Sequence, residues 1–322
     1  LEIFTKIAFW EIPQYQPLST LTLWIQYQIF GIAPQPYILI NIFLWVLNSI
    51  MLYYFVYRFT KSGQISVLIA LLFLLDYRSS DALLFIGRRN SLLALAAGQC
   101  ALIVFLSAFK TYSIQRMEYV GLFFLLGLAL FSDAKSAVFI GAILIYSVLK
   151  TTNKQHTKGL LITGLFILII YLGIRFGLLE TNNNFCYLHV GYRHQTLEVC
   201  YKDYQLLDRA KMFAWNSSAA LMSTFFPQLF SQYGQWQGYQ FSSGFFMSIG
   251  ELVFQFLSFL AIGLAVFKKP KYSLPLLSII MLNALLSLRG YQIGDMLIGI
   301  FAYYSLLGMG ITSFQEMTDR KS

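Results

Sequence analysis

Charged residues are scarce in this sequence: they make up 11% of its 322 residues, whereas an ordinary soluble domain carries about 25%. Acidic residues are the rarer sign, with 14 Asp and Glu against 23 Lys and Arg. Hydrophobic residues account for 57% of the chain. So few charges exclude a soluble domain, and we therefore predict an integral membrane protein that contacts membrane lipids.

The sequence also lacks the common motifs of soluble-cofactor chemistry. It contains no P-loop, no glycine-rich dinucleotide fingerprint, no His-Glu-x-x-His and no closely spaced pair of cysteines. His189 and His194 are five residues apart, but no array of Cys, Asp or Glu completes a metal site around them. We therefore predict no metal site from these residues, and we leave open whether a divalent metal is required.

Long apolar runs recur along almost the whole chain, which leaves no room for a separate soluble domain. We predict one all-α integral membrane domain over residues 1–322, a polytopic helical bundle with about nine spans. The predicted spans cover 37–57, 64–75, 91–109, 118–131, 136–149, 159–178, 245–267, 273–288 and 292–313.

The remaining segments differ from the spans in composition. The first residues hold Pro13, Pro17, Pro34 and Pro36, a spacing that suits helices lying in the membrane interface better than a full span. The predicted organisation is interfacial helices in 1–36, six spans in 37–178, an extracytoplasmic loop with an amphipathic helix in 179–244, three spans in 245–313 and a cytoplasmic tail in 314–322.

The basic residues predict the orientation. If span 37–57 runs inward, the inward-facing segments hold twelve basic residues and three acidic ones, a balance equal to the net charge of +9 of the whole chain. We expect a multi-pass protein of a bacterial inner membrane or an endomembrane, with its basic loops and C-terminus in the cytoplasm. Because these charges are spread over short loops without a groove-reading motif, no nucleic acid is expected as a partner.

The long outward loop contains Cys186 and Cys200, whereas Cys100 falls inside a predicted span. An extracytoplasmic compartment is oxidising, and so we take Cys186 and Cys200 as a candidate disulfide. Two free thiols are the alternative that the sequence leaves open.

Ionisable residues gather at the outward ends of the predicted spans. Asp76, Arg78, Asp81, Arg88 and Arg89 lie between two apolar runs, and Asp133, Lys135, Arg209, Lys211, Arg289 and Asp295 fall at equivalent depths. Charges placed there mark a site by default, and guanidinium groups match phosphate oxygens. A carboxylate among them would act as a base toward an acceptor. The alternatives are a solvated loop or local ion pairs that offset their own burial.

Several stretches, in order along the chain, resemble a known family. They are YQPLSTLT at 15–22, GIAP at 31–34, DALLFIGRR at 81–89 and FSDAKSAV at 131–138, followed by Arg209, Phe226, Pro227 and Tyr233. This pattern resembles the GT-C membrane glycosyltransferases related to the transmembrane-and-TPR protein O-mannosyltransferases. The resemblance covers residues 15 to about 235.

The resemblance implies a GT-C fold and transfer of a sugar from a polyprenyl-phosphate donor, which is the expected partner, to an acceptor on the extracytoplasmic face. It places Asp76 and Asp81 in the cavity as catalytic carboxylates. Arg78, Arg88, Arg89, Lys135 and Arg209 are expected near the donor phosphate. The family's acidic pair precedes its Tyr-Arg-Pro-Leu motif, and so we expect the base, with a span and loop, upstream of Leu1.

This chain departs from the family pattern at chemically important positions. Gln16 stands where the family has Arg, and Ile38 replaces a histidine. The alternative hypothesis is therefore a catalytically degenerate GT-C-fold protein that serves as a structural or accessory subunit of a larger membrane complex. The two hypotheses differ in whether an acidic pair precedes Leu1 and in whether large membrane partners co-purify.

Overall fold

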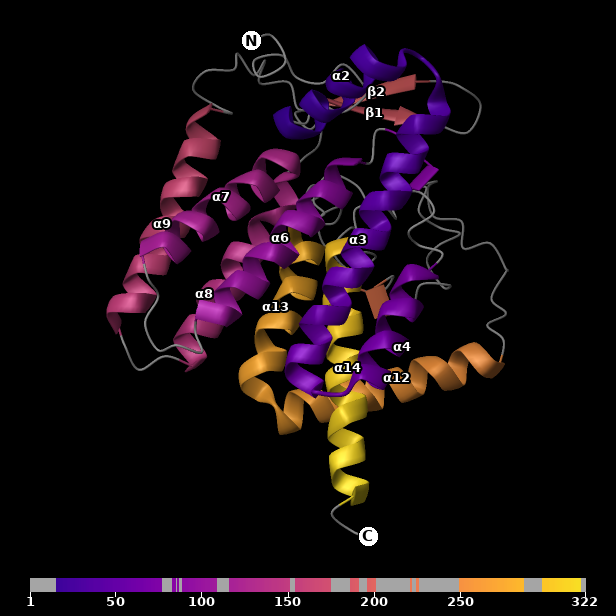
Figure 1. Ribbon diagram of the computed structural model, residues 1–322, viewed down its shortest axis with the longest axis vertical. Helices are drawn as coiled ribbons and strands as arrows, with labels where there is room; N and C mark the ends of the chain where they lie inside the picture. The colour runs from indigo at the N-terminus through magenta and orange to yellow at the C-terminus, as the bar shows by residue number, and fades with distance from the viewer. Residues whose placement is uncertain are drawn as a thin grey trace.

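A computed structural model shows a bundle of helices with one small two-stranded sheet beyond one end of it (Figure 1). The structure describes residues 16–76, 83, 84, 86, 89–108, 116–150, 154–174, 186–190, 196–200, 221, 224, 225, 249–286 and 297–319. The predicted all-helical bundle is confirmed for these residues, with the sheet as an addition. Arg78, Asp81, Arg88 and Arg209, together with residues 1–15, lie outside them.

The helices follow the apolar runs of the sequence closely. They are α2 (Pro17–Phe30), α3 (Pro34–Thr60), α4 (Gly63–Leu74), α6 (Arg89–Ala108), α7 (Arg116–Ser132), the short η4 (Ala134–Ser136), α8 (Ala137–Lys150), α9 (Lys154–Gly173), α12 (Ile249–Lys268), α13 (Pro270–Leu286) and α14 (Leu297–Asp319). Each predicted span overlaps one of these helices.

Three of these helices are long and apolar enough to cross a membrane: α3, α6 and α14. In the other apolar helices, the apolar stretches that the structure describes are 10–17 residues long. Along α3, large apolar side chains such as Leu39, Phe43 and Tyr54 are exposed, while Trp45 and Leu52 are buried against the bundle. Exposed apolar side chains on this scale need a lipid environment, and so the protein is membrane-associated.

The last of these helices, α14, lies at the centre of the bundle. In its most apolar stretch 89% of the residues are buried, against 39% for α3. It contacts α12, α13, α3, α4 and α6. The close approach of α14 to α12 and α3 depends on glycine. A Cβ atom at Gly310 would lie 1.9 Å from the backbone oxygen of Ala261, and one at Gly308 would lie 2.9 Å from Val56.

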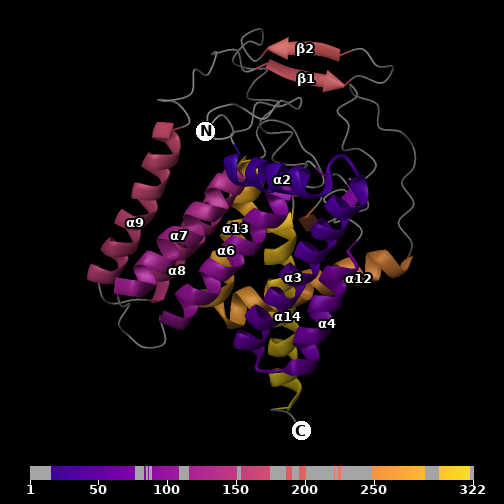
Figure 2. The same cartoon turned by 45° about the horizontal axis from the view of Figure 1, so that its top comes forward.

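The helix α2 lies across one end of the bundle rather than along it (Figure 2). The chain turns from α2 into α3 at Gly31, whose φ of +63° favours glycine. The Tyr37 hydroxyl donates to the Gly31 carbonyl at 2.6 Å and holds this turn. We call this end, where α3, α6, α8 and α14 begin, the α2 end, and the opposite end, where the same helices finish, the basic end.

The strands β1 (Cys186–Val190) and β2 (Thr196–Cys200) form an antiparallel hairpin inside the segment predicted as a long loop. The sequence analysis did not predict these strands. Their register pairs Cys186 with Cys200. Directly opposed residues in an antiparallel pair have Cα atoms about 4.5–5.5 Å apart, a separation that a disulfide also requires. The disulfide itself stays a prediction.

Candidate functional site at the α2 end

Arg89, the first residue of α6, is buried at this end with 1% of its surface exposed. Its Nε donates to Asn41 Oδ1 at 2.9 Å, and its Nη2 donates to the Tyr37 carbonyl, also at 2.9 Å. Its Nη1 donates to Gln26 Oε1. Because Gln26 belongs to α2 while Tyr37 and Asn41 belong to α3, one guanidinium joins three helices.

The acceptors around Arg89 are all neutral. They are two side-chain amides and one backbone carbonyl, and the Tyr37 ring lies with its centroid 6.0 Å from the guanidinium carbon. Among the residues that the structure describes, no carboxylate bonds this guanidinium. In the described part of the chain, its positive charge is therefore stabilised by dipoles and by an aromatic ring.

Asp133 forms a second polar centre on another side of the start of α6. Its Oδ2 accepts from Asn90 Nδ2 and from Ser91 Oγ, each at 3.2 Å, and its Oδ1 accepts from the Lys135 backbone N–H at 3.0 Å. The last contact caps η4, which leads into α8. Asp133 is 5% exposed. It therefore fixes the turn between α7 and α8 against α6.

Three consecutive residues at the start of α6 thus connect its neighbours. Arg89 bonds to α2 and α3, while Asn90 and Ser91 bond to Asp133 after α7. Successive residues of a helix point about 100° apart, and so this short segment contacts opposite sides of the bundle. The start of α6 therefore links the helices that meet at the α2 end.

Asp76, two residues after the end of α4, is the third buried ionisable group that the structure describes at this end. The Tyr304 hydroxyl of α14 donates to Asp76 Oδ2 at 3.0 Å. Two residues earlier, Trp45 Nε1 donates to the Leu74 carbonyl at 3.1 Å, so that the end of α4 is held from α3 as well. Asp76 is therefore anchored to the central helix.

The structure places three sequence-predicted site residues at the same end: Asp76, Arg89 and Lys135. Lys135 lies in η4 and is half-buried. Asp76 and Arg89 bond different neighbours, because Asp76 contacts α14 whereas Arg89 contacts α2 and α3. The other predicted phosphate ligands, Arg78, Arg88 and Arg209, and the carboxylate Asp81 fall outside the described residues. Their roles stay predictions.

Sequence reasoning missed the neutral partners of these charges. Gln26, Asn41 and Tyr304 were not selected, although each bonds a buried ionisable group. Gln26 and Asn41 could have been found from the sequence, because each is an amide side chain inside an apolar helix. A buried amide needs a hydrogen-bonding partner, and so its presence there indicates a polar contact.

The α2 end contains groups that can attract an anion. Arg89 and Lys135 supply positive charge, and α6 and α8 direct their N-terminal ends there. Asp76 supplies a carboxylate that can accept a proton. Comparison with known proteins adds no assignment to this description: the chain matches no protein-family model, no curated protein and no solved structure.

Proposed function

We propose that the chain is a nine-span glycosyltransferase of the GT-C type, acting on the extracytoplasmic face of its membrane. In this proposal the α2 end is extracytoplasmic and the basic end is cytoplasmic. The donor is a sugar linked to polyprenyl phosphate. The support from the sequence is the ordered resemblance between residues 15 and 235, which includes the stretches that contain Arg89 and Lys135.

One observation carries the proposal: among the residues that the structure describes, the buried charged side chains collect at a single end of the bundle. Arg89, Asp133 and Asp76 are 1%, 5% and 7% exposed. Ionisable groups in membrane proteins are costly to bury and mark functional sites by default. Their location at the end where the resemblance expects the donor phosphate favours a sugar-phosphate substrate.

The proposed reaction uses these groups in separate roles. A carboxylate, Asp76 or Asp81, takes the proton of the acceptor group. The acceptor atom then bonds to the anomeric carbon while the bond from that carbon to the phosphate oxygen breaks. Polyprenyl phosphate leaves with the bonding electrons, and the positive charges of Arg89 and Lys135, with Arg78, Arg88 and Arg209, stabilise it.

A specific observation favours a second candidate, an accessory subunit of a membrane complex. Each nitrogen of the Arg89 guanidinium already donates to a protein acceptor, and both oxygens of Asp133 already accept from protein donors. Groups that are occupied in this way hold helices together without any substrate. A degenerate relative would keep this network for stability alone.

Labelling of membranes that contain the full chain, with a radiolabelled polyprenyl-phosphate sugar, tests the proposal. We expect a labelled acceptor, and we expect Asp76→Asn to reduce labelling at least about tenfold, because an amide cannot accept a proton as a carboxylate does. Lys135→Gln should weaken donor binding and raise the donor concentration needed. Lys269→Gln, at the basic end, is the matched control and should label normally.

Tyr304→Phe separates chemistry from packing in this experiment. It removes the hydrogen bond to Asp76 but keeps the carboxylate, so that a smaller loss than in Asp76→Asn is expected. If the wild-type chain gives no labelled acceptor and large membrane partners co-purify stably with it, the glycosyltransferase hypothesis is rejected in favour of the accessory subunit.

A further inference from the structure

The Arg89 guanidinium, which the proposed function places at the donor phosphate, is enclosed by protein. A guanidinium has five N–H groups. Three of these groups donate to Asn41 Oδ1, to the Tyr37 carbonyl and to Gln26 Oε1. Because only 1% of the Arg89 surface is exposed, the other two N–H groups are out of reach of a ligand from outside. One neighbour must therefore move before a phosphate can bind Arg89.

Two of the three acceptors lie on α3, and hydrogen bonds hold this helix against α6 at further positions along its length. Asn48 Nδ2 donates to the Leu92 carbonyl at 3.2 Å. Closer to the basic end, Arg58 Nη2 donates to the Leu106 carbonyl at 2.7 Å. These bonds keep the acceptors on α3 in place beside the start of α6.

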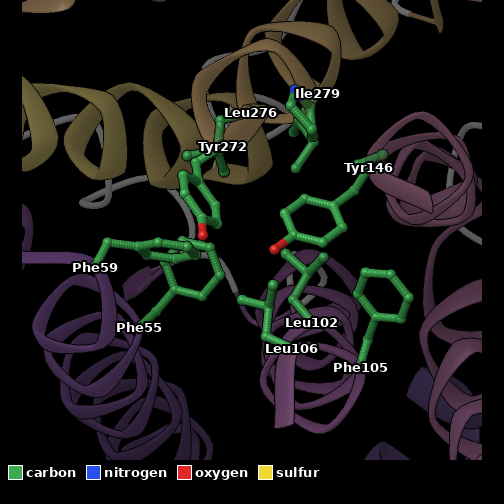
Figure 3. Close-up of a pocket in the computed structure, with 11 residues that line it drawn as sticks. Phe55, Phe59, Leu102, Phe105, Leu106, Tyr146, Tyr272, Leu276 and Ile279 are labelled. Atoms are coloured by element: carbon green, nitrogen blue, oxygen red, sulfur yellow. The ribbon is translucent and has the colours of Figure 1, made fainter. Parts of the chain in front are cut away.

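Aromatic rings also fix α3 relative to α6 at the basic end (Figure 3). The Phe59 ring of α3 and the Tyr272 ring of α13 have centroids 5.1 Å apart. Tyr272 is 5.8 Å from the Tyr146 ring of α8, which is 5.4 Å from the Phe105 ring of α6. Rings at these distances attract one another. The contacts therefore connect α3 to α6 through two other helices, and we expect the movement elsewhere.

The third acceptor, Gln26, belongs to α2, which lies across the end of the bundle (Figure 2). Of residues 23–30, all of which the structure describes, Gln26 alone is buried. Its neighbours Trp24 and Tyr27 are 48% and 55% exposed. The following turn contains Gly31, whose φ of +63° gives the chain a place to bend. The last half of α2 is therefore the neighbour of Arg89 that is held least firmly.

A phosphate is a stronger partner for Arg89 than the Gln26 side chain. Gln26 offers a neutral amide oxygen, whereas a phosphate offers charged oxygens, and hydrogen bonds between two ionised groups are about twice as strong. Two phosphate oxygens also match the two Nη groups of a guanidinium. Because α2 contains no charged residue, its apolar side chains can remain in the membrane interface after Gln26 is released.

We propose that Gln26 occupies the position of a phosphate oxygen at Arg89, and that the phosphate of a polyprenyl-linked ligand displaces it as the last half of α2 moves away. The contact between Gln26 and Arg89 is then autoinhibitory, because it must break before the ligand binds. This inference rests on the proposed function for the identity of the ligand. The release of Gln26 is nevertheless measurable without any sugar transfer.

Calorimetric titration of the purified full chain in detergent with farnesyl phosphate, a short polyprenyl phosphate, tests the displacement. Gln26→Ala removes the competing acceptor and should tighten binding about tenfold. Gln26→Glu places a carboxylate beside Arg89, which repels the phosphate, and should weaken binding at least about tenfold. The matched controls are Gln28→Ala and Gln28→Glu at an exposed position of α2, and they should bind like the wild type.

Farnesol has the same chain without the phosphate, and so the Gln26 variants should bind it as the wild type does. Hydrogen exchange of the wild-type chain gives a second measurement that does not depend on a variant. Farnesyl phosphate should speed exchange of the backbone amides of residues 23–30, because this part of α2 loses its contact with the bundle. Slower exchange would mean that α2 closes over the ligand, and this result would overturn the proposal.

Three binding results would also overturn it: no binding of farnesyl phosphate, shifts in the same direction for the two Gln26 variants, or equal effects at Gln26 and Gln28. These results are distinct from a failure of the proposed function. Opposite shifts for the two Gln26 variants without any labelled acceptor would support the displacement and reject sugar transfer. A labelled acceptor with unshifted Gln26 variants would support sugar transfer and reject the displacement.

Discussion

The two ends of the bundle place their charges differently. At the α2 end Arg89, Asp133 and Asp76 are buried and bonded to protein. At the basic end they lie at the surface: Lys61 lies over the Tyr57 ring, and Lys269 forms an ion pair with Glu316 in which the side chains are 21% and 53% exposed. The same residue types therefore serve internal architecture at one end and contact with the surroundings at the other.

This difference predicts how each end responds to mutation. A buried donor or acceptor that loses its partner costs about 1–3 kcal/mol, because neither water nor protein replaces the lost bond. A surface ion pair is worth about 0–1 kcal/mol, because water solvates both partners when the pair breaks. Substitutions of the buried charges at the α2 end should therefore lower stability more than substitutions of the surface charges at the basic end.

The largest effect is expected for Arg89→Ala. It removes the donor for Gln26, Asn41 and the Tyr37 carbonyl together, so that the free energy of unfolding should fall by at least about 3 kcal/mol. Titration of the purified protein with a denaturing detergent measures this. The matched control at the basic end is Arg58→Gln, which loses only partly exposed bonds and should cost about 1 kcal/mol. Similar losses of stability for the two variants would show that the charges at the two ends do not differ in their contribution to stability.

Asp133→Ala comes next, with an expected loss of about 3 kcal/mol or slightly less, because three donors lose a charged acceptor. Asp133→Asn keeps a carbonyl oxygen and should lose less. Ser91→Ala removes a single donor and should cost about 1 kcal/mol. The same unfolding titration ranks the three variants, and any other order would show that Asp133 does not act as the shared acceptor.

A smaller effect is expected for Gly310→Ala in α14, between the two ends of the bundle, where the free energy of unfolding should fall by about 2 kcal/mol. Its new methyl group would overlap the Ala261 carbonyl oxygen of α12, and so α12 and α14 would have to separate. The control Gly263→Ala adds a methyl group with no atom within 4 Å and should be neutral or stabilise α12 by up to about 1 kcal/mol. Thermal unfolding of both variants in the same detergent measures the difference.

The smallest effect is expected for Glu316→Gln at the basic end. It removes the ion pair with Lys269, whose atoms are 2.9 Å apart, and should change the free energy of unfolding by less than about 0.5 kcal/mol. Added salt should hardly change the difference in the free energy of unfolding between this variant and the wild type. A loss above 1 kcal/mol would mean that the basic end is stabilised by its charges as the α2 end is.

The helical elements were predictable because long apolar runs bounded by basic or proline residues leave few alternatives. The span predicted at 37–57 contains the middle of α3, and the one predicted at 91–109 corresponds to α6 within two residues at its start. That small difference matters, because it brings Arg89 into the helix. The hairpin β1–β2 was not predictable in this way, because two five-residue strands carry too little periodicity to distinguish them from loop.

The candidate site was predictable only in part. Charge selected Arg89 and Asp76, since an ionisable residue beside an apolar run is conspicuous. Their partners were not selected, because Tyr304 is 228 residues from Asp76 in the chain and Gln26 is an ordinary polar residue until a buried charge is placed beside it. Such pairs are set by tertiary packing, which a single sequence does not record.

The central position of α14 has a consequence for biosynthesis. This helix follows α3, α4, α6 and α12 in the chain, yet each of them packs against it. While the ribosome is still producing the later part of the protein, the earlier helices can pack against one another, but their surfaces that face α14 have no partner to bury them. Insertion into the membrane therefore precedes assembly, and the final arrangement is reached only after α14 has entered among helices made before it.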